Sequence, residues 1–262
     1  MRPIGIDLFA GVGGLSLGFE QAGFDVVAAV EYDSIHAAAH AFNFPHCAML
    51  ARSVVGLSGA EIRQKAGIVD RKVNVVFGGA PCQGFSLIGQ RIIDDPRNSL
   101  VREFVRIVRE LEADYFVFEN VKGLTLGAQK KFLDELIEEF SSVGYSTRIP
   151  WKVLNAASYG TPQSRERLIL FGAKRGLAVP EYPAALNGVP RARNDRLSLK
   201  FGPTCADALD DLPDAERFDD LFNRDSVRWS RWAKASEYSL EMRAATPESW
   251  HYGYKRHWDP NL

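Results

Sequence analysis

The sequence predicts an α/β protein with a mostly parallel, doubly wound sheet and helices on both of its faces. Short apolar runs occupy residues 4–9, 25–30, 73–77 and 115–118. Such runs are typical of strands that are buried on both faces of a parallel sheet. Helical patterns separate them, and this alternation indicates βαβ units.

The first unit joins the strand at residues 4–9 to a glycine turn and then to a helix. The turn reads AGVGG, and the helical pattern runs through Leu15 and Phe19 before it stops at Gly23. Glycines allow a backbone to approach a ligand closely, and the start of a helix favours a negative group. This order of elements is typical of the opening of a nucleotide-binding βαβ unit.

A candidate cofactor site follows the second strand, which ends in Glu31, Tyr32 and Asp33. Glu31 comes about twenty residues after the glycine turn, where nucleotide-binding folds place an acid on ribose hydroxyls. Tyr32 is placed to pack on an adenine face, so we expect an adenosine-bearing cofactor. Ser16 interrupts the full G-x-G-x-x-G pattern and argues against a dinucleotide, and a tight turn without a ligand is the alternative.

The remaining elements are predicted from periodicity and from capping residues. Ser34 is expected to cap a helix that ends near Phe42. Further helices are expected near residues 60–66, over 98–111 with one apolar face, and over 132–140 with Gly144 at the end. Further strands are expected near Ala48 and over residues 145–154 and 168–173.

A candidate nucleophile, Cys82, follows the apolar strand at residues 73–77. The carboxyl end of such a strand is where open α/β sheets bind ligands, and Pro81 fixes the backbone just before the thiol. A small buried hydrophobe is the ordinary alternative for a single cysteine. The polar stretch 85–98 is either a lid beside the thiol or an ordinary solvated loop.

Charged residues mark two further strand ends. Glu119 follows the strand at 115–118 and is either a site acid or a solvated strand-end charge. Arg165 and Arg167 enter the strand at 168–173 at alternate positions and are expected to point to one side. They are either surface ion-pair donors or a clamp for a phosphate or a carbonyl edge.

Composition limits the remaining possibilities. The chain has 262 residues and a formal net charge of −1, so a nucleic-acid surface must be local. Cys47, Cys82 and Cys205 form neither a zinc spacing nor a disulfide framework, which indicates a reducing, cytoplasmic setting and no metal. No apolar run is long enough for a bilayer, and no signal-peptide pattern is present.

Taken in order, four motifs resemble the cytosine-5 DNA methyltransferase family. Residues 7–14 read DLFAGVGG, residues 79–86 read GAPCQGFS, residues 119–121 read ENV and residues 163–167 read QSRER. They are similar to the first, fourth, sixth and eighth motifs of that family, and the likeness covers about residues 4–173. The ordered set is specific, although each motif alone is not. The resemblance implies a methyltransferase-type fold.

The resemblance also implies a chemistry. Cys82 would attack C6 of a cytosine flipped out of double-stranded DNA, and S-adenosylmethionine would supply the methyl group for C5. Glu119 would hold or protonate N3 and Arg167 would bind O2, with Arg165 close to the thiol or the DNA backbone. The family's cofactor residues fall here on Phe9, Gly11, Val12, Gly13, Gly14, Glu31, Tyr32, Asp33, Pro81 and Leu100. Its DNA contacts fall on Ser86, Gln90, Arg91 and Arg97.

The sequence departs from the family pattern in three ways. Ser53 stands where the family usually has an acid for the adenine amino group, and Tyr32 where it often has Trp. Counterparts of the ninth and tenth motifs and of a target-recognition domain are not recognisable. We therefore expect a catalytic and cofactor-binding domain at residues 1–175 and, over 176–262, an irregular extension that leads toward an absent target-recognition domain.

Several functions remain open from the sequence. The leading hypothesis is a DNA (cytosine-5) methyltransferase of a restriction-modification or similar bacterial system, weak or inactive as this chain alone. The chain would then be either a shortened enzyme or one half of a split enzyme whose second polypeptide carries the missing motifs. The alternatives are a non-catalytic or partner-dependent subunit of a split methyltransferase and an RNA cytosine-5 methyltransferase. A nicotinamide oxidoreductase is disfavoured by Ser16.

Overall fold

The computed structural model describes residues 2–81, 99–188, 200–224 and 233–244. The chain divides into two compact units. The first contains Met1–Val153 and Arg167–Tyr182, and the second contains Leu154–Glu166 and Pro183–Arg256. Each unit is considered separately below.

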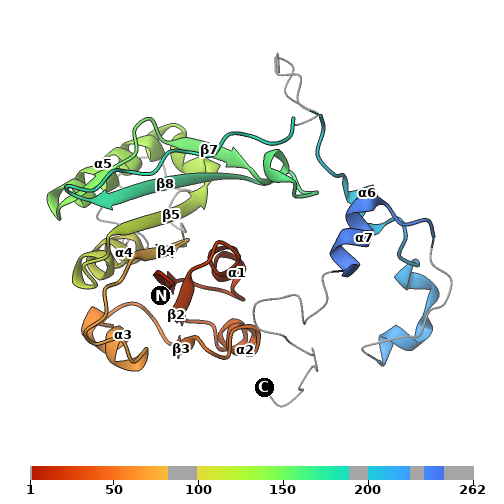
Figure 1. Ribbon diagram of the computed structural model, residues 1–262, viewed down its shortest axis with the longest axis horizontal. Coiled ribbons are helices and arrows are strands. Elements are labelled where there is room, and N and C mark those ends of the chain that lie inside the picture. The colour runs from red at the N-terminus through yellow and green to blue at the C-terminus, as the bar shows by residue number, and fades with distance from the viewer. Residues whose placement is uncertain (1, 82–98, 189–199, 225–232, 245–262) are drawn as a thin grey trace. The chain divides into compact units, whose positions relative to one another are not determined.

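The first unit is built on a mixed sheet (Figure 1). Its strand order is β3-β2-β1-β4-β5-β8-β6, and β7 also pairs with β8. Strands β1 to β5 run parallel where they pair, whereas β8 is antiparallel to both β5 and β6. The strands span Ile4–Leu8, Asp25–Glu31, Ala48–Ala51, Val75–Gly78, Tyr115–Val121, Tyr145–Thr147, Lys152–Asn155 and Glu166–Lys174, from β1 to β8.

Helices cover both faces of this sheet. Phe19 of α1 stacks on Phe77 of β4, with ring centroids 3.8 Å apart. On the other face Phe116 stacks on Phe140 of α5 at the same centroid distance. The helices of this unit are α1 (Gly14–Gln21), α2 (Ser34–Asn43), α3 (Gly59–Lys65), α4 (Ser99–Glu110) and α5 (Ala128–Ser142). The predicted doubly wound α/β fold is therefore confirmed.

The apolar core explains why the strand predictions succeed. All five residues of β1 and all four of β4 are buried, so neither strand alternates between polar and apolar residues. On α4 the apolar positions Val101, Phe104 and Val108 are buried against the sheet. Phe104 packs edge-on against Phe118 of β5, with ring centroids 5.4 Å apart.

The structure corrects three local predictions. Asp33, not Ser34, caps α2, because its carboxylate accepts hydrogen bonds from the backbone N–H groups of Ile35 and His36. The single strand expected at 145–154 is two strands, β6 and β7, with a cis Ile149–Pro150 bond between them. Glu119 does not follow its strand, since β5 continues to Val121 and pairs with β8 there.

The second unit is largely irregular. Where the structure describes this unit, its helices are short. Helix α6 spans Cys205–Leu209 and α7 spans Glu237–Ala244, and the 3₁₀ turns η4, η5 and η6 span Ala156–Tyr159, Ala215–Arg217 and Asp219–Phe222. Thr204 closes a capping box at the start of α6. Hydrogen bonds from the Cys205 thiol to the Pro162 carbonyl (3.0 Å) and from the Tyr159 hydroxyl to the Pro183 carbonyl (3.3 Å) join the two segments of this unit.

Candidate active site

A cavity of about 580 Å³ opens at the carboxyl edge of the parallel strands in the first unit. It is lined by the last residues of β2, by residues that follow β1, β2, β3 and β4, and by one residue each from α2 and α4. The carboxyl ends of parallel strands meet at one sheet edge, which is where open α/β folds bind ligands. The lining residues are Phe9, Val30, Glu31, Tyr32, Asp33, His36, Arg52, Ser53, Val54, Gly79, Pro81 and Leu100.

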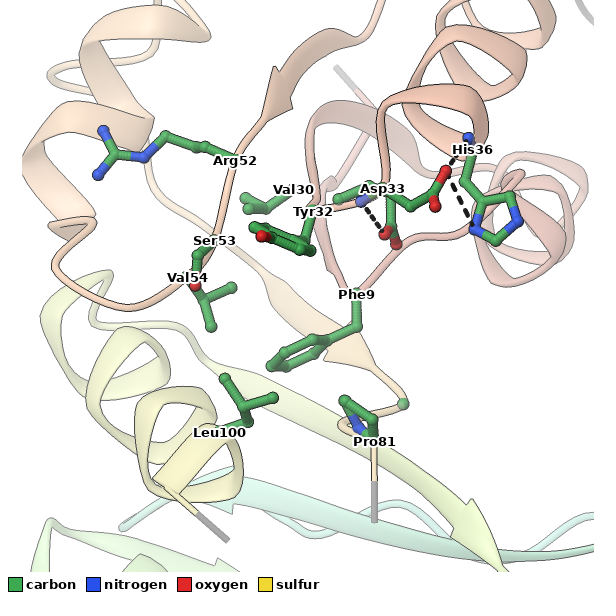
Figure 2. Close-up of a pocket in the computed structure, with 12 residues that line it drawn as sticks. Phe9, Val30, Tyr32, Asp33, His36, Arg52, Ser53, Val54, Pro81 and Leu100 are labelled. Carbon is green, nitrogen blue, oxygen red and sulfur yellow. Dashed lines mark hydrogen bonds and ion pairs between the residues drawn. The ribbon is translucent and has the colours of Figure 1, made fainter. Parts of the chain in front are cut away.

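Aromatic and aliphatic side chains form the walls of this cavity. Figure 2 shows the rings of Phe9 and Tyr32 directed toward a common space, with Leu100 and Val54 at its side. Tyr32 is 79% exposed, so one face of its ring is free to pack on a planar ligand. Phe9 has a φ of 59°, an uncommon conformation for a non-glycine residue that is concentrated at functional sites.

Glu31 connects the cavity to the glycine turn. Its Oε2 accepts a hydrogen bond from the Gly11 N–H at 2.8 Å, and its Oε1 accepts one from the Asp33 N–H at 2.8 Å. Both oxygens keep further lone pairs that can accept hydrogen bonds. Asp33 is held in turn by α2, and the hydrogen bond from the His36 backbone is the main cause that lowers the pKa of its carboxyl group.

The structure brings together six of the predicted cofactor residues. Phe9, Glu31, Tyr32, Asp33, Pro81 and Leu100 line the cavity. The glycine turn, with Gly11, Val12, Gly13 and Gly14, does not line it but lies beside it, joined through the Gly11 N–H bond to Glu31. A side chain at Gly13, whose φ is 97°, would place its Cβ 2.2 Å from the Phe44 ring.

Five lining residues were not predicted from the sequence. They are Val30, His36, Arg52, Val54 and Gly79. Arg52 directly follows the short strand β3, and a position at the carboxyl end of a strand is the sequence signal that identifies it. Its guanidinium points away from the cavity in Figure 2 and pairs with Glu61 at 2.8 Å. Ser53 accepts a hydrogen bond from the Val55 N–H at 3.1 Å.

An acid and a guanidinium meet next to this cavity. The Oε1 atom of Glu119 lies 2.9 Å from Nε of Arg167, and the two side chains are 22% and 26% exposed. The pairing of β5 with β8 places Arg167 opposite Val121, two residues from Glu119 and on the neighbouring strand. The pair is thus fixed by two strands and still open to a ligand.

The segment that leads to Cys82 is packed tightly against this pair. A Cβ on Gly79 would lie 2.6 Å from Oε2 of Glu119, and one on Gly78 would lie 2.0 Å from the Leu8 carbonyl oxygen. Only glycine therefore fits at the end of β4. Asn120, which is buried, donates a hydrogen bond from Nδ2 to the Ala80 carbonyl at 3.1 Å.

Other predicted site residues lie elsewhere. Arg165 precedes β8 and is exposed; its backbone N–H donates to Oδ1 of Asn155 at 3.2 Å within the second unit. Cys82, Ser86, Gln90, Arg91 and Arg97 lie outside the described residues.

The described ranges contain neither a metal-binding cluster nor a membrane-spanning helix. Among these residues no group of three or more His, Cys, Asp or Glu side chains is arranged to hold a metal ion. No helix in the same ranges has the length and apolar character needed to cross a bilayer. Cys47 is a buried free thiol and Cys205 an exposed one.

The fold and the cavity define an α/β protein with a candidate ligand site at the carboxyl edge of its sheet. The sequence profile of the C-5 cytosine-specific DNA methylase family matches residues 4–259. The chain belongs to this family, which confirms the resemblance inferred from the four motifs.

Individual relatives are consistent with this assignment. The chain is 54% identical over 261 residues to the Type II methyltransferase M.XorII of Xanthomonas oryzae pv. oryzae, which covers 100% of this chain and 58% of that protein. It is 36% identical over 221 residues to the Type II methyltransferase M.AquIA of a Picosynechococcus strain, covering 80% of this chain and 89% of that one. The chain thus spans little more than half of the first relative and most of the second.

Solved structures share the fold. A candidate DNA modification methyltransferase encoded within an E. coli prophage superposes with a TM-score of 0.58 at 36% identity, over 66% of this chain and 47% of that one. Spodoptera frugiperda DNMT2 superposes with a TM-score of 0.53 at 24% identity, over 77% of this chain and 57% of that one. The second likeness concerns the fold alone.

Proposed function

We propose that this protein methylates C5 of a flipped-out cytosine in double-stranded DNA, with S-adenosylmethionine as the methyl donor and Cys82 as the nucleophile. The activity would belong to a restriction-modification or similar bacterial system. The observation that carries the proposal is the Glu119–Arg167 pair, which packs against Gly79 at the start of the segment leading to Cys82. Membership of the C-5 cytosine-specific DNA methylase family supports it.

The residues around the cavity fit S-adenosylmethionine. A planar base would pack against the rings of Phe9 and Tyr32, and Glu31 would offer acceptors for ribose hydroxyls. The glycine turn at the start of α1 suits the carboxylate of the amino-acid portion, because backbone N–H groups there favour negative charge. When bound, the cofactor supplies an electrophilic methyl group.

The side chains that face the cytosine would have separate roles in the reaction. The Cys82 thiolate adds to C6, which is a poor electrophile until charge is drawn off the ring. Glu119 holds or protonates N3 and Arg167 binds O2, so both stabilise the charge that develops as the C6–S bond forms. C5 then becomes electron-rich and is the atom that is methylated. A base removes the C5 proton, the C6–S bond breaks, and Cys82 leaves as thiolate.

DNA contacts are assigned to other parts of the chain. Ser86, Gln90, Arg91 and Arg97 would bind the DNA backbone around the flipped nucleotide, at an unstacking cost of a few kcal/mol. Arg165 would lie on the backbone or near the thiol, where its positive charge favours thiolate. Residues 1–175 would form the catalytic and cofactor-binding domain, and 176–262 would lead toward the target-recognition part.

Full activity would require more polypeptide than these 262 residues. The chain spans 58% of M.XorII and 60% of the Type II methyltransferase M.AgeI, so both relatives carry substantial further sequence. We expect the corresponding segment, as part of the same chain or as a second polypeptide, to supply the target recognition that selects the DNA site.

Transfer of a labelled methyl group tests the proposal. The 262-residue chain is assayed alone and with the part of M.XorII that lies outside the aligned region, on duplex DNA and on RNA. We expect weak transfer by the chain alone, stronger transfer to DNA with the added segment, and none by Cys82→Ser. Cys205→Ser, which removes an exposed thiol, is the control and should stay active. Transfer to RNA alone, or equal transfer by Cys82→Ser, would contradict the proposal.

A further inference from the structure

A chain of three buried polar side chains lies behind the glycine turn, and the reaction proposed above does not use it. Ser16 Oγ lies 2.7 Å from Oδ2 of Asp7 and 3.0 Å from Nε2 of His40. All three residues have no exposed surface. They come from β1, α1 and α2, so the chain joins the strand before the turn to both helices that follow it.

The proton positions in this chain follow from its geometry. Ser16 has one hydroxyl proton, which it donates to the carboxylate of Asp7. Ser16 Oγ then accepts a hydrogen bond from His40, whose ring must carry its hydrogen on Nε2. Within the described part of the chain, neither Oδ1 of Asp7 nor Nδ1 of His40 has a hydrogen-bond partner. A proton taken up by Oδ1 of Asp7 would therefore leave both hydrogen bonds of Ser16 in place.

Several ionisable groups surround Asp7. Glu31 is on β2, Glu20 is on α1, His40 is on α2 and Cys47 lies just before β3, while β4 places the apolar Phe77 opposite Asp7. Burial is the largest cause that raises the pKa of Asp7 to about 7; hydrogen bonds from Ser16 oppose it and the charge of Glu31 adds to it. Burial also lowers the pKa of His40 to about 4, and it raises the pKa of the Cys47 thiol.

The turn lies between two carboxyl groups. On the cavity side Glu31 accepts from the Gly11 N–H, and on the buried side Asp7 accepts from Ser16 in the first turn of α1. Gly13 packs directly on α2, since a Cβ at this position would lie 3.0 Å from the His40 ring. Asp7 is therefore joined through Ser16 to the helix that follows the turn.

We propose that Asp7, with Ser16 and His40, is a positioning residue for the cofactor turn, and that it gives up a proton when a cationic cofactor binds. This rests on the proposed function, because the cation is the sulfonium of S-adenosylmethionine. Hydroxyl donors from the ribose would weaken the field of Glu31 on Asp7, and the sulfonium charge would favour the ionised carboxyl group. Both effects act in the same direction.

The linkage gives the direction of the pH effect. If binding favours ionised Asp7, then ionised Asp7 favours binding, by the same factor. The cationic donor should therefore bind more weakly as the pH falls through 7. S-Adenosylhomocysteine lacks the sulfonium but shares the other ionisable groups, so the ratio of the two affinities isolates the part that depends on the cation.

Isothermal titration of both ligands between pH 6 and pH 8.5 tests the inference. In the wild type we expect the preference for S-adenosylmethionine to fall about fivefold toward pH 6, at the low end of typical coupling between sites. Asp7→Asn keeps an acceptor for Ser16 but cannot ionise, so its ratio should be independent of pH. Ser16→Ala removes the donor that stabilises the ionised form, so its transition should move to higher pH.

Asp114→Asn is the matched control. Asp114 is 8% exposed but lies just before β5, at the opposite edge of the sheet, and should leave the wild-type profile unchanged. A wild-type ratio that is flat, or one that falls equally in Asp7→Asn, would overturn the inference while leaving the cofactor assignment intact. Failure of the wild type to bind either ligand at any pH would overturn both.

Discussion

Glu119 and Arg167 meet across two antiparallel strands, with Oε1 of the acid 2.9 Å from Nε of the guanidinium. The pair is held by backbone pairing on both sides and has a glycine, Gly79, directly beneath the carboxylate. It brings a hydrogen-bonding acid and a permanent cation to one point. In the proposed reaction that point is the pyrimidine edge of the cytosine.

Replacement of the acid should affect catalysis far more than folding. Glu119→Gln keeps the shape but loses the charge and the proton-transfer capacity, so we expect methyl transfer to fall by about 10²–10⁴. The free energy of unfolding should change by less than about 1 kcal/mol, because the ion pair is partly exposed. Single-turnover methyl transfer and urea unfolding measure the two effects. A variant that unfolds at a lower urea concentration than the wild type but keeps the wild-type rate of methyl transfer would show that the pair is structural rather than catalytic.

The glycine beneath the carboxylate gives a steric test. Gly79→Ala would place a Cβ 2.6 Å from Oε2 of Glu119 and displace that side chain. A misplacement of about 1 Å can cost about 10²-fold in rate, and we expect a loss of this size. Gly18→Ala is the control, since its Cβ would meet nothing within 4 Å and Gly18 is an exposed position of α1. Equal rates for Gly79→Ala and Gly18→Ala would contradict this account of the pair.

The buried groups behind the glycine turn predict how stability depends on pH. The pKa of Asp7 rises from 3.8 to about 7 on folding, so its contribution to stability is lost as the pH rises through that range. The pKa of His40 falls from 6.5 to about 4, so its contribution is lost as the pH falls through that range. The two effects oppose each other between about pH 4 and 6.5.

Single substitutions should separate these effects. Asp7→Asn removes the first, so its free energy of unfolding should rise with pH between 4 and 6.5 more steeply than that of the wild type. His40→Gln removes the second and should give the opposite slope. Each effect amounts to at most about 4 kcal/mol, from 1.36 kcal/mol per pKa unit. Urea unfolding at a series of pH values measures the slopes, and identical slopes in all three proteins would contradict the assignment.

Ser53 predicts an altered recognition of the cofactor base. The cavity offers a hydroxyl at this position, which can donate or accept, whereas a carboxylate can only accept. Ser53→Asp should therefore increase the preference for S-adenosylhomocysteine over its hypoxanthine analogue by roughly tenfold, since a hydrogen bond to a charged group contributes about 1.5–3 kcal/mol. Competition binding measures this preference. Ser53→Ala is the control, and no gain of preference in Ser53→Asp would argue that the base lies elsewhere.

The parts of the fold that were predictable are those with a local cause. The apolar runs of β1 and β4 have every residue buried, so composition alone identifies them. The cap of α2 was placed one residue late because Asp33 and Ser34 are both good capping residues, and only the hydrogen bonds distinguish them. The single strand expected at 145–154 overlooks Pro150, which has no N–H to donate to a sheet and lies between β6 and β7.

The site was predictable as a set of strand ends but not as a set of contacts. Glu31 and Tyr32 were expected at the cavity because they follow a strand at the right interval. The contact of Glu119 with Arg167 depends on the register of β5 against β8, which no local pattern encodes. Asp7 opens the motif at residues 7–14, but its burial and its hydrogen bond to Ser16 come from the packing of α1 and α2.

Covalent trapping tests the central claim, that Cys82 attacks a cytosine, most directly. The chain, combined with the segment of M.XorII outside the aligned region, is incubated with S-adenosylmethionine and duplex DNA that carries 5-fluorocytosine, which cannot lose a C5 proton. The adduct is then mapped by peptide mass analysis. We predict a covalent complex through the peptide that contains Cys82, retained in Cys205→Ala and lost in Cys82→Ala. An adduct that maps to another residue, or that survives in Cys82→Ala, would contradict the account.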